Sequence, residues 1–145
     1  MKKIILLFVS VLSLGLVSTS CSKSDSEDSS TSASIVGKWE LYQTGEKIGS
    51  TESLDLYMHQ SGCAKDYAEF KVNGTFETKT YEVACAVSTT SGTYSKSGNS
   101  LTTTDEYGPT TVVIKELSSS TLKVYDTYTD GGTTYTDITV LKRMN

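Results

Sequence analysis

From Ile35 onward, the hydrophobic and polar positions of the chain show almost no helical periodicity. Residues that favour strands, above all threonine, tyrosine and valine, recur instead in short runs that turn residues interrupt. This pattern predicts an all-β domain. The predicted strands cover residues 36–43, 66–73, 75–83, 91–97, 100–105, 110–117, 121–129 and 133–142.

The stretch 44–65 is the part of this domain for which the pattern leaves two alternatives. It can hold a short helix around Ser53–Met58, where the sequence is SLDLYM, or it can be an irregular loop.

Two turns join neighbouring strands as tight hairpins. Asn73-Gly74 is a strong signal for a two-residue type I′ turn, because both residues tolerate the positive φ that this turn requires. Gly98-Asn99 joins the strands 91–97 and 100–105. The register around Asn73-Gly74 brings Cys63 and Cys85 to within one position of facing each other.

The last hairpin turns at the sequence DGG, residues 130–132, and its register can be tested. A three-residue loop places Leu122 opposite Val140, so that one face of the strand pair becomes apolar. A two-residue loop at the two glycines would place Asp126 opposite Asp137, and like charges in facing positions are destabilising. The sequence therefore favours the three-residue loop.

Short hairpins in sequence order make an antiparallel up-and-down meander. An exposed meander edge invites aggregation, and closing the sheet into a barrel removes that edge. We therefore expect an eight-stranded β-barrel over residues 35–145, with a β-sandwich as the alternative. In an immunoglobulin domain the tryptophan lies between the two cysteines, whereas Trp39 precedes both Cys63 and Cys85.

The first 20 residues have the pattern of a signal peptide. Lys2 and Lys3 precede an apolar run of about 14 residues at 4–17, which is shorter than the roughly 20 residues that a membrane-spanning helix needs. Small residues follow, and Cys21 comes directly after them. This exit resembles a bacterial lipobox, which implies cleavage before Cys21 and a lipid on its thiol.

Residues 22–34 follow the cysteine with the sequence SKSDSEDSSTSAS. They contain almost nothing to bury, which predicts a disordered tether. Lysine and acids just after a lipid cysteine resemble the export signal of surface lipoproteins in some Gram-negative bacteria; the alternative is an ordinary solvated spacer. The expected location is the bacterial cell envelope, anchored by lipid in the outer membrane, with exposure at the cell surface as a further expectation.

The other two cysteines, Cys63 and Cys85, are predicted to form a structural disulfide, because their hairpin brings them together and an exported chain meets an oxidising environment. A metal site or a catalytic centre is not indicated, since His59 is the only histidine and no Cys-x-x-Cys spacing occurs. The chain is expected to hold no cofactor and not to be an enzyme.

The charge balance bears on the partners. The chain has 13 Lys plus Arg against 17 Asp plus Glu, a formal net charge of −4. No basic patch stands out along the sequence, which argues against nucleic acid or an anionic membrane surface as a partner of the domain.

A series of sequence blocks runs through the predicted domain. VGKWEL at 36–41 carries Gly-x-Trp, the blocks FKVNGTF, SGTYSKSGNSLT and IKELSSSTLKV follow, and the last strand ends at Lys142-Arg143. In this order the blocks resemble small bacterial lipocalin-like lipoproteins, which have a calycin-type barrel. The resemblance covers most of 35–145. It implies that Arg143 packs on Trp39 and closes one end of the barrel.

The resemblance also implies that the barrel binds a small amphipathic or hydrophobic molecule at its open end. The alternative is a non-enzymatic surface interaction or inhibitor module that works through its loops, above all 44–65, around a filled barrel. The candidate lining residues are expected to face inward: Phe70, Phe76, Leu101, Ile114, Val124, Tyr128 and Ile138.

Overall fold

A computed structural model of the chain describes residues 33–145. The predicted signal peptide, Cys21 and most of the predicted tether lie outside the described residues. Within them, no helix is long and apolar enough to cross a membrane.

Nine strands follow one another along the described chain, with one short 3-10 helix between the fourth and the fifth strand. They are β1 (Gly37–Ile48), β2 (Thr51–Leu56), β3 (Tyr67–Phe70), β4 (Thr75–Tyr81), η1 (Val83–Cys85), β5 (Val87–Ser97), β6 (Ser100–Asp105), β7 (Gly108–Leu117), β8 (Thr121–Asp130) and β9 (Thr133–Arg143).

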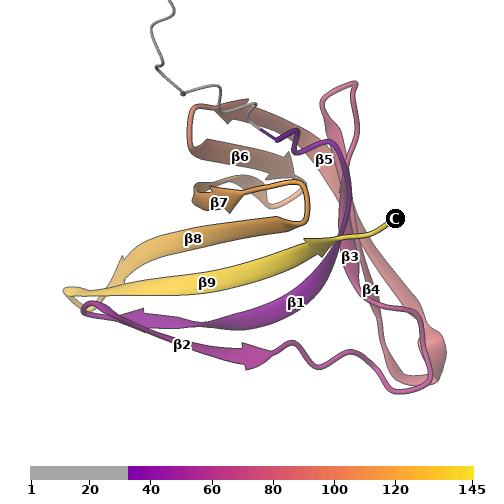
Figure 1. Cartoon of the computed structure of the whole chain (residues 1–145), viewed down its shortest axis with the longest axis horizontal. Helices are drawn as coiled ribbons and strands as arrows, with labels where there is room; N and C mark the ends of the chain where they lie inside the picture. Colours follow the sequence, from indigo (N-terminus) through magenta and orange to yellow (C-terminus); the bar gives the residue numbers. More distant parts are fainter. Residues whose placement is uncertain (1–32) are drawn as a thin grey trace, which may run out of the picture. The chain divides into compact units, whose positions relative to one another are not determined.

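The sheet closes because β1 pairs along both of its edges. One edge pairs with β9, and the other pairs first with β3 through Gly37–Glu40 and then with β2 through Gln43–Ile48. Since β3 to β9 pair in sequence order, the result is a closed antiparallel barrel of eight strands with β2 as an extra strand (Figure 1). The predicted barrel is confirmed, and the sandwich alternative is wrong because one continuous sheet closes on itself.

The segment 44–65 does not contain the helix that was one of its two alternatives. β1 continues to Ile48, and β2 returns beside it as Thr51–Leu56. The short strand β3 pairs with β1 only as far as Glu40. The next stretch of β1 therefore presents unpaired backbone groups, and β2 satisfies them.

The hairpin at Asn73-Gly74 forms where it was predicted, with a register that differs by one residue. Phe70 pairs with Phe76, and the Lys71 N–H donates to the Thr75 carbonyl oxygen at 2.8 Å, so the loop has three residues instead of two. The Asn73 side-chain oxygen accepts the Thr75 N–H at 3.2 Å and its hydroxyl at 2.7 Å. These two bonds stabilise the longer loop.

The β8–β9 hairpin has the two-residue loop that the charge argument had rejected. Asp130 pairs with Thr133 across Gly131-Gly132, and both glycines have a positive φ, 55° and 81°. Positive φ at both positions gives the type I′ turn that matches the twist of the strands. Asp126 therefore lies opposite Asp137.

Cross-strand pairs nearer the turn stabilise this register. The Tyr128 and Tyr135 rings stack with their centroids 5.5 Å apart. Two pairs of threonine hydroxyls hydrogen-bond across the strands, Thr127 to Thr136 at 3.0 Å and Thr129 to Thr134 at 3.3 Å. Such pairs contribute roughly 0.2–1 kcal/mol each. Together they outweigh a carboxylate repulsion that solvent and salt screen at this end of the strands.

The barrel interior holds the main hydrophobic cluster. Its buried members are Ile35, Trp39, Phe70, Phe76, Leu101, Ile114, Leu122 and Leu141. Apart from Ile35, which precedes β1, they come from β1, β3, β4, β6, β7, β8 and β9, so side chains from nearly all strands meet there.

A second hydrophobic cluster, called the outer cluster here, lies on the outside of the sheet. Its members are the buried Tyr125, Ile138 and Val140, with Tyr42 and Leu54 packed against them. The register of β8 and β9 places these residues on the face opposite to Leu122 and Leu141. The hairpin β1–β2 curls over this face: a Cβ at Gly45 would lie 1.8 Å from the Ser53 carbonyl oxygen.

The disulfide between Cys63 and Cys85 is present, as predicted, with Cα atoms 5.3 Å apart. It joins the segment before β3 to η1, which follows β4. The segment between β2 and β3 is thus held against the end of the β4–β5 hairpin.

Replacing Cys63 and Cys85 together by alanine is expected to lower the free energy of unfolding by about 3 kcal/mol, because the cross-link removes chain entropy from the unfolded state. Urea unfolding measures the change. Cys21→Ser is the matched control and is expected to leave the stability as it is. A double variant as stable as the native chain would contradict the structural role of the disulfide.

Candidate ligand-binding site

One end of the barrel is closed by Trp39 and Arg143. Trp39 is fully buried, and its Nε1–H donates to the Ile35 carbonyl oxygen at 2.7 Å. The guanidinium carbon of Arg143 lies 4.0 Å from the centre of the Trp39 ring. A planar guanidinium over an indole combines stacking with cation–π attraction.

The same guanidinium donates to backbone carbonyls from two other places in the chain. Nη1 and Nη2 donate to Val36 and Ser34, at the entry to β1, and Nε donates to Ser119 in the turn between β7 and β8 at 2.9 Å. A Cβ at Gly37 would lie 2.5 Å from Nη1, so the glycine of Gly-x-Trp leaves room for Arg143. The contacts that the lipocalin resemblance implied for Trp39 and Arg143 are therefore present.

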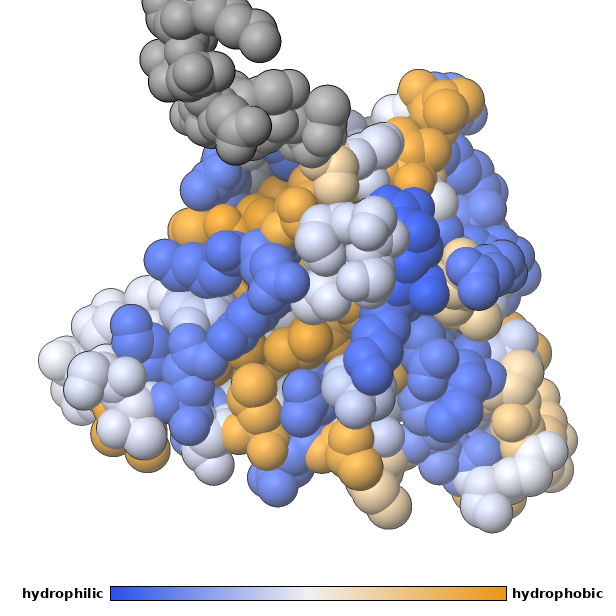
Figure 2. Space-filling model, in the orientation of Figure 1, coloured by the Kyte–Doolittle hydropathy of each residue, from blue (hydrophilic) through white to orange (hydrophobic). Residues whose placement is uncertain are grey.

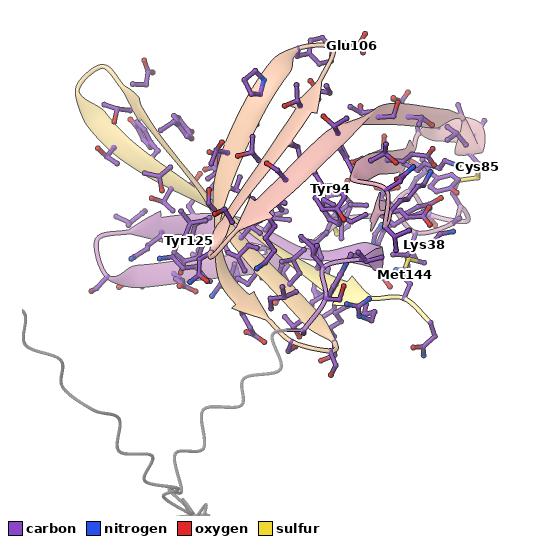
Figure 3. All side chains as sticks on the ribbon, turned by 90° about the horizontal axis from the view of Figure 1, so that it is seen from above. Lys38, Cys85, Tyr94, Glu106, Tyr125 and Met144 are labelled. Carbon is purple, nitrogen blue, oxygen red and sulfur yellow. A yellow bond between two sulfur atoms is a disulfide. The ribbon has the colours of Figure 1, made fainter. Side chains whose placement is uncertain are left out.

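The half of the barrel next to this closure is filled by side chains. Phe70, Phe76, Leu101 and Ile114, four of the predicted lining residues, are buried in the main cluster, and Val124 packs against it. The Phe70 ring meets the Tyr94 ring edge-on at 5.0 Å; Figure 3 labels Tyr94. These side chains contact one another instead of surrounding an open cavity.

Ile138 does not face inward as predicted. It pairs with Tyr125 and lies in the outer cluster. The reason is the two-residue β8–β9 loop, because a shift of one position turns every side chain of a strand to the other face.

The other end of the barrel is open. Toward this end, the last residue pair between β7 and β8 is Val113–Tyr125, and the last pair between β1 and β9 is Glu46–Asp137. Beyond these points the hairpins β1–β2, β6–β7 and β8–β9 fan apart, with Glu106 at the tip of β6–β7 (Figure 3). Tyr128 lies on the part of β8 that extends past β7.

Two adjoining hollows at this end form what we call the open-end recess. The larger has a volume of about 410 Å³ and the smaller about 220 Å³, and Glu46 and Asp137 line both. The larger is completed by Thr44, Gly45, Ile138 and Thr139, and the smaller by Lys47, Ile48, Gly49, Thr133, Thr134, Tyr135 and Thr136.

The charged residues that line the recess are two acids, Glu46 and Asp137, and one lysine, Lys47. The pKa of Tyr128 is raised above its usual value, mainly by the nearby Asp137 carboxylate and then by partial desolvation and by Glu46. A raised tyrosine pKa means that the surroundings oppose a further negative charge. The same surroundings favour a positively charged group.

A separate polar cluster fixes the segment between β2 and β3. His59 Nδ1 accepts the Asp66 backbone N–H at 3.0 Å, and His59 Nε2 lies 3.4 Å from Glu40 Oε1. Asp66 Oδ1 accepts the Tyr81 N–H at 2.8 Å. Burial, and then hydrogen bonding to Asp66, raises the pKa of Tyr57. Residues 33–145 contain no group of three or more His, Cys, Asp or Glu that could hold a metal ion.

Comparison with protein families adds the deciding observation. The family model described as a lipocalin-like domain matches residues 35–124. The chain belongs to the lipocalin-like family. Lipocalin-like domains are generally binding proteins and not enzymes, and the fold suggests small hydrophobic ligands.

Solved structures show the same fold. The lipocalin-like domain is similar to a lipocalin-like protein from Bacteroides uniformis, with 16% identity and a TM-score of 0.56 over 76% of this chain and 98% of that one. It is also similar to an uncharacterized protein from Bacteroides eggerthii, with 13% identity and a TM-score of 0.55 over 77% of this chain and 100% of that one. No curated protein matches the chain.

Tyr128, a predicted lining residue, lines neither hollow but stacks on Tyr135, which does. The sequence analysis missed Glu46, Asp137 and Tyr135. Glu46 was missed because β1 was expected to end at residue 43, and the other two because the β8–β9 register was shifted. The adjacent glycines at 131 and 132 were the signal that could have shown the correct register.

Arg143→Lys is expected to lower the free energy of unfolding by about 1–3 kcal/mol, because lysine keeps the charge but loses the stacked plane and the fork of donors. The adjacent exchange Lys142→Arg is the control and should cost little. Thermal or urea unfolding compares the two variants. Equal stability of both would show that Arg143 acts only as a charge.

Proposed function

We propose that this chain is an exported, lipid-anchored binding protein whose lipocalin-like barrel holds a small amphipathic molecule in the open-end recess. The observation that carries the proposal is the asymmetry of the barrel. One end is sealed by Arg143 on Trp39 and filled, whereas the other opens into a hollow of about 410 Å³. Ligand pockets commonly have volumes of roughly 300–1,000 Å³, and the volume of this hollow, which is widely open to solvent, lies in that range.

The lining indicates the kind of molecule. Threonine hydroxyls, the Tyr135 ring and the aliphatic Ile48 offer hydrogen bonds and apolar contact, and Glu46 with Asp137 favours a positive group. A large lipid fits less well, because the apolar side chains of the interior are already packed against one another. The proposed ligand is therefore a small amphipathic molecule with a cationic or hydrogen-bond-donating end.

The proposed location rests on the N-terminal sequence. Cys21 follows a signal-peptide pattern, and the other two cysteines of the chain are joined to each other. Its thiol is thus the one that remains for a lipid. Each buried methylene contributes roughly 0.8 kcal/mol to membrane binding, and more than one acyl chain gives a stable anchor. The outer membrane, with exposure at the cell surface, is the proposed compartment.

Native mass spectrometry of the barrel domain purified from bacterial extract tests the ligand. We expect a retained small molecule that is lost in Tyr135→Ala, because Tyr135 lines the recess. Tyr107→Ala is the matched control, since Tyr107 is an exposed tyrosine at the β6–β7 turn and should leave the ligand in place. A domain that is always empty would refute ligand binding and favour the loop-based interaction module.

Cys21→Ser tests the anchor. The protein is expected to leave the membrane fraction and appear in the soluble fraction of broken cells, because the variant lacks the thiol that takes the lipid. Cys63→Ser with Cys85→Ser serves as the control, since it also removes thiols but should keep the membrane association. Unchanged fractionation of Cys21→Ser would refute lipidation.

A further inference from the structure

Three lysines from three strands converge on one tyrosine on the outside of the barrel. Lys115 Nζ lies 5.0 Å from the centre of the Tyr125 ring, and Lys47 Nζ and Lys123 Nζ each lie 5.7 Å from it. Because all three are so close to one point, no two of these ammonium groups are more than about 11 Å apart. A fourth, Lys142 Nζ, lies 3.3 Å from the centre of the Tyr42 ring.

These four lysines belong to one surface, called the lysine face here. Tyr42 and Tyr125 both belong to the outer cluster, so the lysines surround that cluster from β1, β7, β8 and β9. Among the described residues, Lys123 is the one of these four lysines that forms an ion pair, and its partner is Glu52. The other three ammonium groups form no ion pair among the described residues, although Glu52 lies opposite Lys47 and Glu40 opposite Lys142 in the strand ladders.

The lysine face could not be seen along the sequence. Its lysines stand at positions 47, 115, 123 and 142, and the pairing of β7 with β8, β8 with β9, and β9 with β1 brings them together. The observation that no basic patch stands out along the sequence concerns neighbouring residues only, and so it does not exclude this cluster on the folded surface.

Exposed aliphatic side chains accompany these lysines. Val113 pairs with Tyr125 and is 43% exposed, and Leu56 pairs with Gln43 at the β2 edge and is 62% exposed. Figure 2 shows hydrophobic residues interspersed with hydrophilic ones where β1, β2, β8 and β9 lie. Lysine with aliphatic and tyrosine side chains is the composition of surfaces that lie in a membrane interface.

The acidic recess lies on the other side of the same strands. Glu46 and Lys47 are neighbours in β1, so their side chains point to opposite faces, Glu46 into the recess and Lys47 onto Tyr125, although Lys47 also borders the smaller hollow. An anionic surface would attract the lysine face and repel the recess. The lysines have a structural role as well, because their alkyl chains cover the outer cluster. This role does not require their ammonium groups to lie close together.

We infer that the lysine face docks the domain on an anionic lipid surface, with the ammonium groups on lipid phosphates and the aliphatic side chains at the headgroups. The exposed Val113 and Leu56 favour a lipid surface over an acidic polysaccharide, which offers no apolar layer to receive them. This contact is additional to ligand binding, and it does not depend on Cys21.

Vesicle flotation of the fragment 31–145 tests the docking without the anchor. This fragment is a compact unit that contains the whole barrel, its core and the disulfide. We expect it to bind vesicles of phosphatidylcholine mixed with phosphatidylglycerol, and not vesicles of phosphatidylcholine alone. The binding should weaken as salt rises, because salt screens exposed charges.

Lys115→Gln with Lys142→Gln, neither of which lines the recess, is expected to weaken binding to the anionic vesicles about 30-fold, since each lysine near such a surface contributes about fivefold. The matched control is Lys71→Gln with Lys96→Gln, which removes the same charge elsewhere and should change binding less than about twofold. Thermal unfolding of both double variants confirms that they are folded.

Three results would overturn the inference: equal binding to both kinds of vesicle, an equal loss in both double variants, or binding to a soluble acidic polysaccharide without binding to anionic vesicles. The salt dependence of the native fragment needs no variant, so a poorly folded variant does not remove the test. None of these results bears on the retained ligand, which native mass spectrometry examines separately.

Discussion

The stacking of Arg143 on Trp39 is the contact on which the closed barrel depends. Arg143 ends β9 and Trp39 lies near the start of β1, so the contact joins the first and last strands of the barrel. The further bonds from Arg143 add the entry to β1 and the β7–β8 turn. The ladder between β1 and β9, which begins at the Trp39–Arg143 pair, removes the two unpaired edges of the sheet, and unpaired edges are sites for aggregation. The packed half of the barrel lies directly beside this pair.

The packed core therefore lies toward one end of the barrel, and the proposed binding site lies at the other. The main cluster holds the end that Arg143 closes, and the hairpins that fan apart at the other end need only local contacts such as the Tyr128–Tyr135 stack. A register irregularity between Leu41 and Gln43 changes which residues of β1 face inward. After it, Glu46 faces the recess and Lys47 faces the outer cluster. One strand therefore supplies both the acidic inner face and the basic outer face.

Local patterns in the sequence were enough to predict most strands, the Gly98-Asn99 turn and the disulfide, because these depend on neighbouring residues and on one hairpin. β2 could not be predicted in this way. It forms because β3, which lies further along the chain, is short and leaves part of β1 unpaired. The β8–β9 register depends on several weak interactions across the strands. The prediction considered the repulsion between the Asp126 and Asp137 carboxylates, but the tyrosine stack and the threonine pairs together outweigh that repulsion. The recess residues Glu46 and Asp137 follow from these two features and were missed with them.

The two charged faces are close in space, yet they can act separately. Successive side chains of a strand point to opposite faces of the sheet, and exposed charges are screened beyond about 8 Å at physiological ionic strength. The negative recess and the lysine face therefore present distinct potentials to solvent, although Glu46 and Lys47 are adjacent. A lipid anchor on a flexible tether limits how far a domain can lie from the membrane, but it does not set the orientation of the domain. With the proposed docking, attraction at one face and repulsion at the other would turn the recess away from the lipid, toward the side from which a small molecule arrives.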